Sequence, residues 1–170
     1  DRPDDDQPNM AQLFRLNEKW PYPLMPSEYV QRQFHVSFQD DPVAVACRHI
    51  TGLSTIMWGN DYPHAEGTFR GSQRLLSSLM AGVPDDEVEA ILTEVPGIGL
   101  WTARGFLLVA LDRPDVFLSG DLALRRAIQR AYGFDHLPTE AEAAQVSDRW
   151  RPYRSLAVSY LFASEYQERP

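Results

Sequence analysis

One backbone turn and one carboxylate, about twenty residues apart, are the parts of this sequence best suited to chemistry. The turn is Pro96-Gly97-Ile98-Gly99 and the carboxylate is Asp121. Unpaired amides at a helix start lie at the positive end of the helix dipole, so the turn could hold a phosphate. An ionised carboxylate nearby could stabilise positive charge that develops as a bond breaks. The pair therefore predicts cleavage of a bond close to a bound phosphate.

The turn must be held between two helices for its amides to converge. Apolar spacing predicts a short helix at 85–92 and a second one at about 99–111. The amides of Gly97, Ile98 and Gly99 then lie at the start of the second helix, and glycine keeps side chains away from a phosphate at that point. An ordinary glycine-containing turn between helices is the alternative interpretation.

Asp121 is predicted to open the helix that follows a short, buried, extended run at 116–118. In its simplest role it is only the N-cap of that helix. The residues expected on the core face of the helix are Leu122, Leu124, Ala127 and Ile128.

Three sequence blocks together carry a family resemblance: Val-Pro-Gly-Ile-Gly-Leu-Trp-Thr-Ala at 95–103, Asp-Val-Phe-Leu-Ser-Gly-Asp-Leu-Ala-Leu at 115–124, and Trp-Arg-Pro-Tyr-Arg-Ser-Leu-Ala at 150–157. In this order and spacing, residues from about 92 to 165 resemble the helix-hairpin-helix (HhH-GPD) DNA glycosylase superfamily. Within that superfamily they resemble the alkylpurine, or 3-methyladenine type II, glycosylases. The resemblance implies base excision repair of damaged double-stranded DNA.

The resemblance also implies roles for single residues. Asp121 matches the family's catalytic aspartate, which stabilises the cationic sugar and helps to align the attacking water. The carbonyls of Thr93, Val95 and Gly97 match positions that hold a monovalent Na or K ion against a DNA phosphate, and no other cofactor is required. The residues expected to contact nucleic acid are Thr93, Val95, Gly97, Ile98, Gly99 and Thr102.

Trp101 indicates the subtype of glycosylase. Lyase-type members of the superfamily place a lysine here to attack the sugar, which indole cannot do. The single lysine of the chain, Lys19, is far from the motif, so a monofunctional enzyme that uses water is expected. Trp101 and Phe162 would form walls of the base pocket, with Trp101 stacked on an electron-poor alkylated base, although plain core packing remains open for Trp101. Gly105 stands where an aromatic wall is expected.

The first half of the chain, about residues 10–92, resembles the last part of metal-dependent amidohydrolases of the decarboxylase-like family. The segments that carry this likeness are 25–33, 35–42 and 55–64. By the resemblance, Asp61 would be the metal-binding carboxylate. The family's paired histidines are absent, however, and two strand-like runs cannot close a barrel. This half is therefore interpreted as an inactive remnant.

Composition limits the remaining choices. We expect a mainly α chain with a smaller α/β N-terminal half that carries one or two short strands, at Val36–Phe38 and about 55–58. The expected division is a disordered tail at 1–9, an amidohydrolase-like segment at 10–90 and a glycosylase-like segment at 91–170. A single cysteine, Cys47, suits a reducing cytoplasm, and no apolar run is long enough to span a membrane.

Charge predicts modest binding to DNA. The net charge is −8; residues 1–90 carry 7 Lys and Arg against 14 Asp and Glu, whereas 91–170 carry 9 against 10. Backbone affinity depends on cations that displace counterions, so binding should centre on the hairpin. Three functions stay open: an alkylpurine glycosylase, a metal-dependent amidohydrolase or decarboxylase fragment that uses Asp61, and a non-catalytic DNA-binding fusion.

Overall fold

A computed structural model describes residues 21–167, and side chains as far as residue 165. This part of the chain is mainly helical with one two-stranded sheet, as composition and periodicity predicted. The tail expected at 1–9 and the single lysine, Lys19, lie outside the described residues. The elements are α2 (Pro26–Gln33), β1 (Val36–Phe38), α3 (Pro42–Ala46), α4 (Arg48–Thr51), η1 (Leu53–Thr55), β2 (Ile56–Trp58), η2 (Phe69–Gly71), α5 (Ser72–Leu79), α6 (Asp85–Thr93), α7 (Leu100–Val109), α8 (Leu122–Tyr132), α9 (Glu140–Ser147), η3 (Asp148–Trp150) and α10 (Arg154–Gln167).

The chain divides into two compact units. The described part of the first comprises residues 21–38 and 46–59. Its strands β1 and β2 pair in parallel, with Val36 opposite Ile56 and Phe38 opposite Trp58. Both strands form where short β-branched and aromatic runs predicted them.

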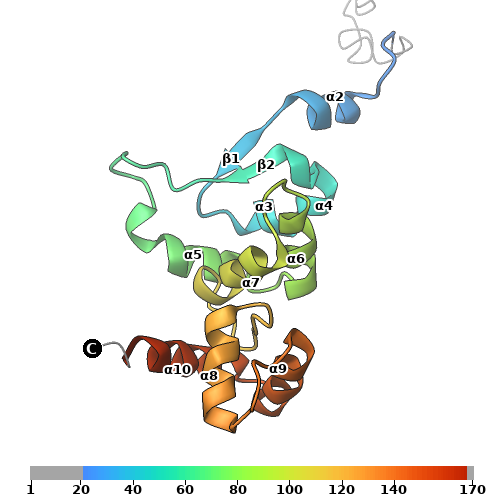
Figure 1. Ribbon diagram of the computed structural model, residues 1–170. Coiled ribbons are helices and arrows are strands. Elements are labelled where there is room, and N and C mark those ends of the chain that lie inside the picture. Colours follow the sequence, from blue (N-terminus) through green and yellow to red (C-terminus); the bar gives the residue numbers. More distant parts are fainter. Residues whose placement is uncertain (1–20, 168–170) are drawn as a thin grey trace, which may run out of the picture. The chain divides into compact units, whose positions relative to one another are not determined.

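The second unit comprises residues 39–45 and the chain from residue 60 onward. Helices α6 and α7 pack against each other, and α8 lies against both α9 and α10 (Figure 1). The fully buried side chains at its centre come from α7, α8 and α10 and from the segment after α7. They include Leu107, Leu111, Leu124, Ile128 and Val158.

The boundary expected near residue 90 is not where the compact units separate. Residues 60–90 belong with the C-terminal helices because side chains tie them to the end of α7. Ser77 donates a hydrogen bond to the carbonyl of Leu111 at 2.7 Å, and Arg113 donates to the carbonyls of Met80 and Val83 at 2.6 and 2.8 Å. The second unit is therefore longer than the segment that sequence alone suggested.

Helices α8 and α10 differ from expectation at one face each. Leu122, the first residue of α8, is exposed, although Leu124 and Ile128 are buried as predicted. In α10, Val158 is buried, but Leu156 and Tyr160 are 57% and 71% exposed. These two are one turn apart, so one face of α10 is outside the core that sequence predicted for it.

Candidate active site

The N-terminal ends of α7 and α8 bring Trp101 and Asp121 together. Trp101 is the second residue of α7, and its Nε1–H donates to Oδ2 of Asp121 at 2.9 Å. Asp121 is the N-cap of α8, where its Oδ1 accepts from the amide of Leu124 at 2.9 Å. The prediction that Asp121 opens a helix is confirmed, and the same carboxylate also contacts the tryptophan of the hairpin.

This arrangement fixes a carboxylate beside an accessible aromatic ring. Each oxygen of Asp121 accepts one N–H, so the group has two separate anchors and a defined orientation. Trp101 is 55% exposed, which leaves the indole ring open to a ligand while its N–H edge is engaged. A planar, electron-poor group could stack on the ring, and positive charge that forms close by would be stabilised by the carboxylate.

The loop before Asp121 is held by a cluster of ion pairs that sequence reasoning missed. The Nε of Arg154 donates to Oδ1 of Asp115 at 2.7 Å, and Arg151 donates to Oδ2 at 2.9 Å. The hydrogen bond from Arg154, helped by the charges of Arg154 and Arg151, lowers the pKa of Asp115 against the opposing effect of burial. The buried run 116–118 follows at once, and Leu118 accepts from the amide of Asp121 at 3.0 Å.

The hairpin between α6 and α7 presents a group of unpaired amides. Gly97 has a φ of 93°, a left-handed conformation that favours glycine. Gly99 is the extended N-cap residue of α7. Within the described chain, no acceptor is found for the amides of Gly97, Gly99, Leu100, Trp101 and Thr102.

One amide of the expected anion grip is already used inside the turn. The N–H of Ile98 donates to the carbonyl of Val95 at 3.0 Å, so it closes the turn and is not available to a ligand. The Thr93 hydroxyl likewise donates to the carbonyl of Glu89 at 2.8 Å, back within α6. The remaining free amides still converge at the start of α7, where the helix dipole favours an anion.

Phe162 and Gly105 occupy the two further positions at which pocket walls beside Trp101 were considered. Phe162 is half-buried in α10, and among the described residues no ring contact joins it to Trp101. A Cβ atom at Gly105 would meet no heavy atom within 4 Å, so the space beside it is open. The pocket-wall role of Phe162 stays a prediction.

Asp61 lies in an exposed loop after β2 and does not gather metal ligands. Its Oδ2 is 3.2 Å from Nδ1 of His64, and both side chains are largely exposed. In residues 21–165 no three His, Cys, Asp or Glu side chains are grouped so that they could hold a metal ion. The two parallel strands form a sheet of two within the described range. Within the described residues, the metal-binding role expected for Asp61 under the amidohydrolase alternative therefore has no set of three ligands.

The fold and site thus define a small helical unit that can hold an anion at the start of α7 and present, at the start of α8, a carboxylate hydrogen-bonded to an exposed tryptophan. No family model matches the chain. It is similar to "Putative DNA-3-methyladenine glycosylase YfjP" of Bacillus subtilis, with 34% identity over 100 residues that cover 59% of this chain and 33% of that protein. DNA-3-methyladenine glycosylase 2 of Escherichia coli is 34% identical over 93 residues, covering 54% of this chain and 30% of its own.

The chain therefore spans about a third of the length of these curated relatives. A solved structure of the Schizosaccharomyces pombe 3-methyladenine DNA glycosylase Mag1 with abasic DNA aligns with a TM-score of 0.47 and 21% identity, over 72% of this chain and 61% of that one. The similarity in sequence relates the chain to the 3-methyladenine DNA glycosylases and lends no support to the amidohydrolase resemblance.

Proposed function

We propose that this chain carries the hairpin and catalytic aspartate of a helix-hairpin-helix DNA glycosylase that removes alkylated purines from double-stranded DNA. The observation that supports it most directly is the hydrogen bond between Trp101 and Asp121, beside the unpaired amides at the start of α7. The sequence similarity to 3-methyladenine glycosylases points to the same chemistry.

The proposed reaction is hydrolysis of the N-glycosidic bond. The bond from C1′ to the base nitrogen breaks, and its electron pair goes to the base, which leaves neutral because alkylation had made it cationic. Asp121 stabilises the oxocarbenium character at the sugar, water adds to C1′, and its proton passes to the Asp121 carboxylate or to solvent. The products are a free base and an abasic site.

Trp101 serves two purposes in this proposal. Its ring stacks on the flipped base, and a cationic purine gains a cation–π attraction that a normal purine lacks. Its N–H holds the carboxylate on which the reaction depends. An indole provides no amine for a Schiff base, so the enzyme is monofunctional.

The hairpin is proposed to hold a DNA phosphate. Gly97, Gly99 and the amides that follow them would donate to its oxygens. A Na or K ion would bind at the carbonyls of Thr93, Val95 and Gly97. Carbonyl oxygens suit such a hard cation, and within the described residues the Thr93 and Gly97 carbonyls accept no hydrogen bond. When bound, the ion would add positive charge beside the phosphate.

Release of free base from methylated duplex DNA by the purified chain tests the proposal. Asp121→Asn should abolish release, because asparagine is an equally good N-cap but carries no charge. Asp112→Asn, an exposed residue of the same unit, is the matched control and should act like wild type. Duplex binding without any base release by wild type would instead favour the non-catalytic DNA-binding alternative.

A further inference from the structure

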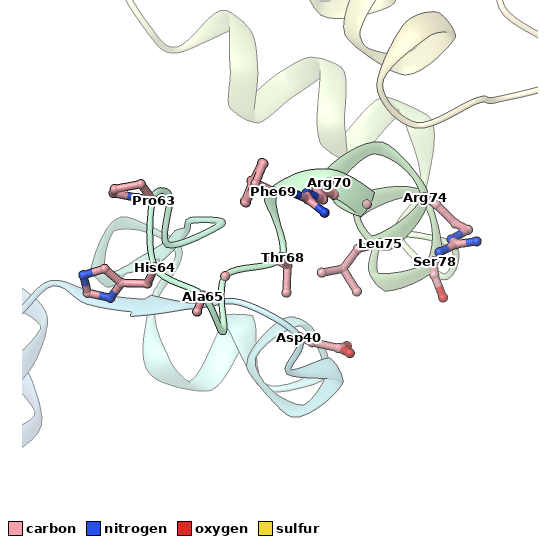
Figure 2. A pocket seen from close by; sticks show the side chains of 12 residues that line it. Asp40, Pro63, His64, Ala65, Thr68, Phe69, Arg70, Arg74, Leu75 and Ser78 are labelled. Atoms are coloured by element: carbon pink, nitrogen blue, oxygen red, sulfur yellow. The ribbon is translucent and has the colours of Figure 1, made fainter.

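A second polar feature of the same compact unit lies away from the Trp101–Asp121 pair. A cavity of about 880 Å³ is lined by Asp40, the loop before η2, η2 itself and α5 (Figure 2). Arg70 comes from η2, whereas Arg74 and Ser78 are one turn apart on the same side of α5. Figure 2 shows Arg70 on the short turn and the other two side chains on the helix that follows it.

Neither arginine of this cavity is neutralised by the protein. Both are exposed, and in the described residues no acidic side chain pairs with Arg70 or Arg74. The Arg70 guanidinium lies 5.6 Å from the ring centre of Phe69. These two unpaired cations stand in the half of the chain that has 7 basic against 14 acidic residues.

Other arginines of the unit behave differently. Arg104 pairs with Glu89 at 2.9 Å, and Arg113 lies 3.0 Å from Asp85. Acids are thus available to arginines elsewhere in this unit, yet none reaches the cavity pair. The two arginines of the cavity are therefore available to bind an anion from outside the chain.

Helix α5, which carries Arg74, is held in place by two neighbouring polar side chains. Gln73 donates from Nε2 to the carbonyl of Val109 at 2.8 Å, and Ser77 donates to that of Leu111 at 2.7 Å. These contacts attach α5 to the C-terminal end of α7, whose N-terminal end carries the free hairpin amides. A helix of ten residues is about 15 Å long, which corresponds to roughly four base pairs along a duplex at about 3.4 Å each.

We propose that the cavity of Arg70 and Arg74 binds phosphates of the DNA backbone as a second anchoring point beside the hairpin; the identity of the ligand rests on the proposed function. Its volume is that of a site for an extended ligand rather than a single ion. Arg70 extends from η2 and Arg74 from α5, so the cavity presents two separate positive groups, one for each of two phosphates. Arginine binds phosphate oxygens through paired donors.

Asp40 gives the proposal a test of opposite sign. It lines the same cavity, and Figure 2 shows its carboxylate apart from the Arg70 side chain. An acid at this place repels a phosphate, so Asp40→Asn should tighten duplex binding. No hydrogen bond of the Asp40 side chain is found in the described chain, and a purely structural site would not gain affinity from this change.

The experiment measures binding of an undamaged duplex by fluorescence anisotropy between about 50 and 200 mM salt. The slope of log K against log salt is negative, and loss of one phosphate contact reduces its magnitude by about 0.9. We expect the magnitude to fall by about 1 for Arg70→Gln or Arg74→Gln and by about 2 for both. Arg149→Gln, an exposed arginine of the same unit outside the cavity, removes equal net charge and should leave the slope unchanged.

Two further arms separate the possible failures. If inorganic phosphate alone binds with dependence on the two arginines while duplex binding ignores them, the site takes the free ion and the proposal is wrong. Base release is followed in parallel. Release with an unaltered salt slope in the double variant would overturn the second anchoring point and keep the glycosylase. An altered slope in the double variant, with no base release by wild type, would keep the second anchoring point and overturn the glycosylase.

Discussion

The indole N–H of Trp101 and the carboxylate of Asp121 meet at 2.9 Å across twenty residues of sequence. The contact joins the start of α7 to the start of α8, so an aromatic surface and a charged group hold a fixed relation. The amide of Leu124 holds the other oxygen of Asp121. The two helix starts must be positioned correctly before the pair can form.

Trp101→Phe keeps a ring for stacking and removes the hydrogen-bond donor to Asp121. Loss of a hydrogen bond to a charged group corresponds to about 1.5–3 kcal/mol, so kcat for base release should fall about 10- to 100-fold. KM for the damaged duplex should change much less. Single-turnover kinetics would measure the effect. Trp150→Phe also removes an indole hydrogen bond, to the Tyr132 hydroxyl at 3.0 Å, and should leave kcat unchanged.

Gly97→Ala and Gly99→Ala separate backbone strain from contact with a ligand. A Cβ at either position would meet no atom of the protein within 4 Å. Gly97 has a φ of 93° and Gly99 one of −92°. Alanine at 97 should therefore lower the free energy of unfolding by about 1 kcal/mol. Alanine at 99 should lower it by no more than roughly a few tenths of a kcal/mol.

Both variants should weaken duplex binding if a phosphate occupies the turn, because each Cβ would stand where the ligand approaches. Urea unfolding and anisotropy on the same samples would separate the two effects. Full-strength binding by a stable Gly99→Ala protein would show that the hairpin does not contact the backbone at that residue.

Asp115→Asn should destabilise the protein and reduce its sensitivity to acid. The carboxyl is 25% exposed and its partner Arg154 is 17% exposed, so loss of the charge leaves a partly buried cation without its counter-ion. The cost should be about 2 kcal/mol at pH 7. Asp148→Asn, which breaks a more exposed pair with Arg151, should cost well under about 1 kcal/mol.

The pH dependence has a definite sign. The pKa of Asp115 is below 3.8 in the folded state, chiefly because of the hydrogen bond from Arg154. The stabilisation is thus present above that pH and is lost as the pH falls through the folded pKa. Unfolding followed from pH 7 to pH 2 should show a steep loss in wild type that is smaller in Asp115→Asn. Parallel curves would contradict this account.

His136 should titrate above 6.5. Its Nδ1 lies 2.7 Å from Asp135, and its Nε2 lies 3.2 Å from Glu142. These contacts, the one with Asp135 first, raise the pKa of His136. The associated stability is complete below about pH 6.5 and is lost as pH rises through the folded pKa. An NMR titration of the imidazole would measure it, and Asp135→Asn should bring the pKa of His136 down.

Thr68→Val should stabilise the protein. The Thr68 hydroxyl oxygen is buried without a hydrogen-bond partner, and an unpaired buried polar group costs about 1–3 kcal/mol. Valine has nearly the same shape, so urea unfolding should show a gain of about 1 kcal/mol. The same substitution at Thr139, whose hydroxyl caps α9 by accepting from the amide of Glu142, should lower stability by about 1 kcal/mol.

Local features of the fold were predictable because they depend on neighbours in sequence. Pro96 and Gly97 end α6, and an aspartate at 121 caps α8, as residue type and spacing indicated. The buried run 116–118 was also correct, because an apolar segment bounded by polar residues has few alternatives.

Contacts between distant segments were not predictable in the same way. Three such contacts join separate elements. They are the hydrogen bond from Trp101 to Asp121, the ion pairs of Asp115 with Arg151 and Arg154, and the attachment of residues 72–83 to the end of α7. Periodicity reports only which face of a helix is apolar and says nothing of its partner. The spacing of Arg70 and Arg74 was visible in the sequence, but their lack of acidic partners became apparent only in the fold.

One oxygen of Asp121 accepts a hydrogen bond from the amide of Leu124 and the other accepts one from the indole of Trp101, so the first turn of α8 and the proposed reaction centre form and break together. Any fraying of that turn removes the carboxylate from its place. The hydrogen-exchange rate of the Leu124 amide therefore reports how often the centre is assembled. A base that stacks on Trp101 should slow hydrogen exchange of the Leu124 amide without contacting Leu124.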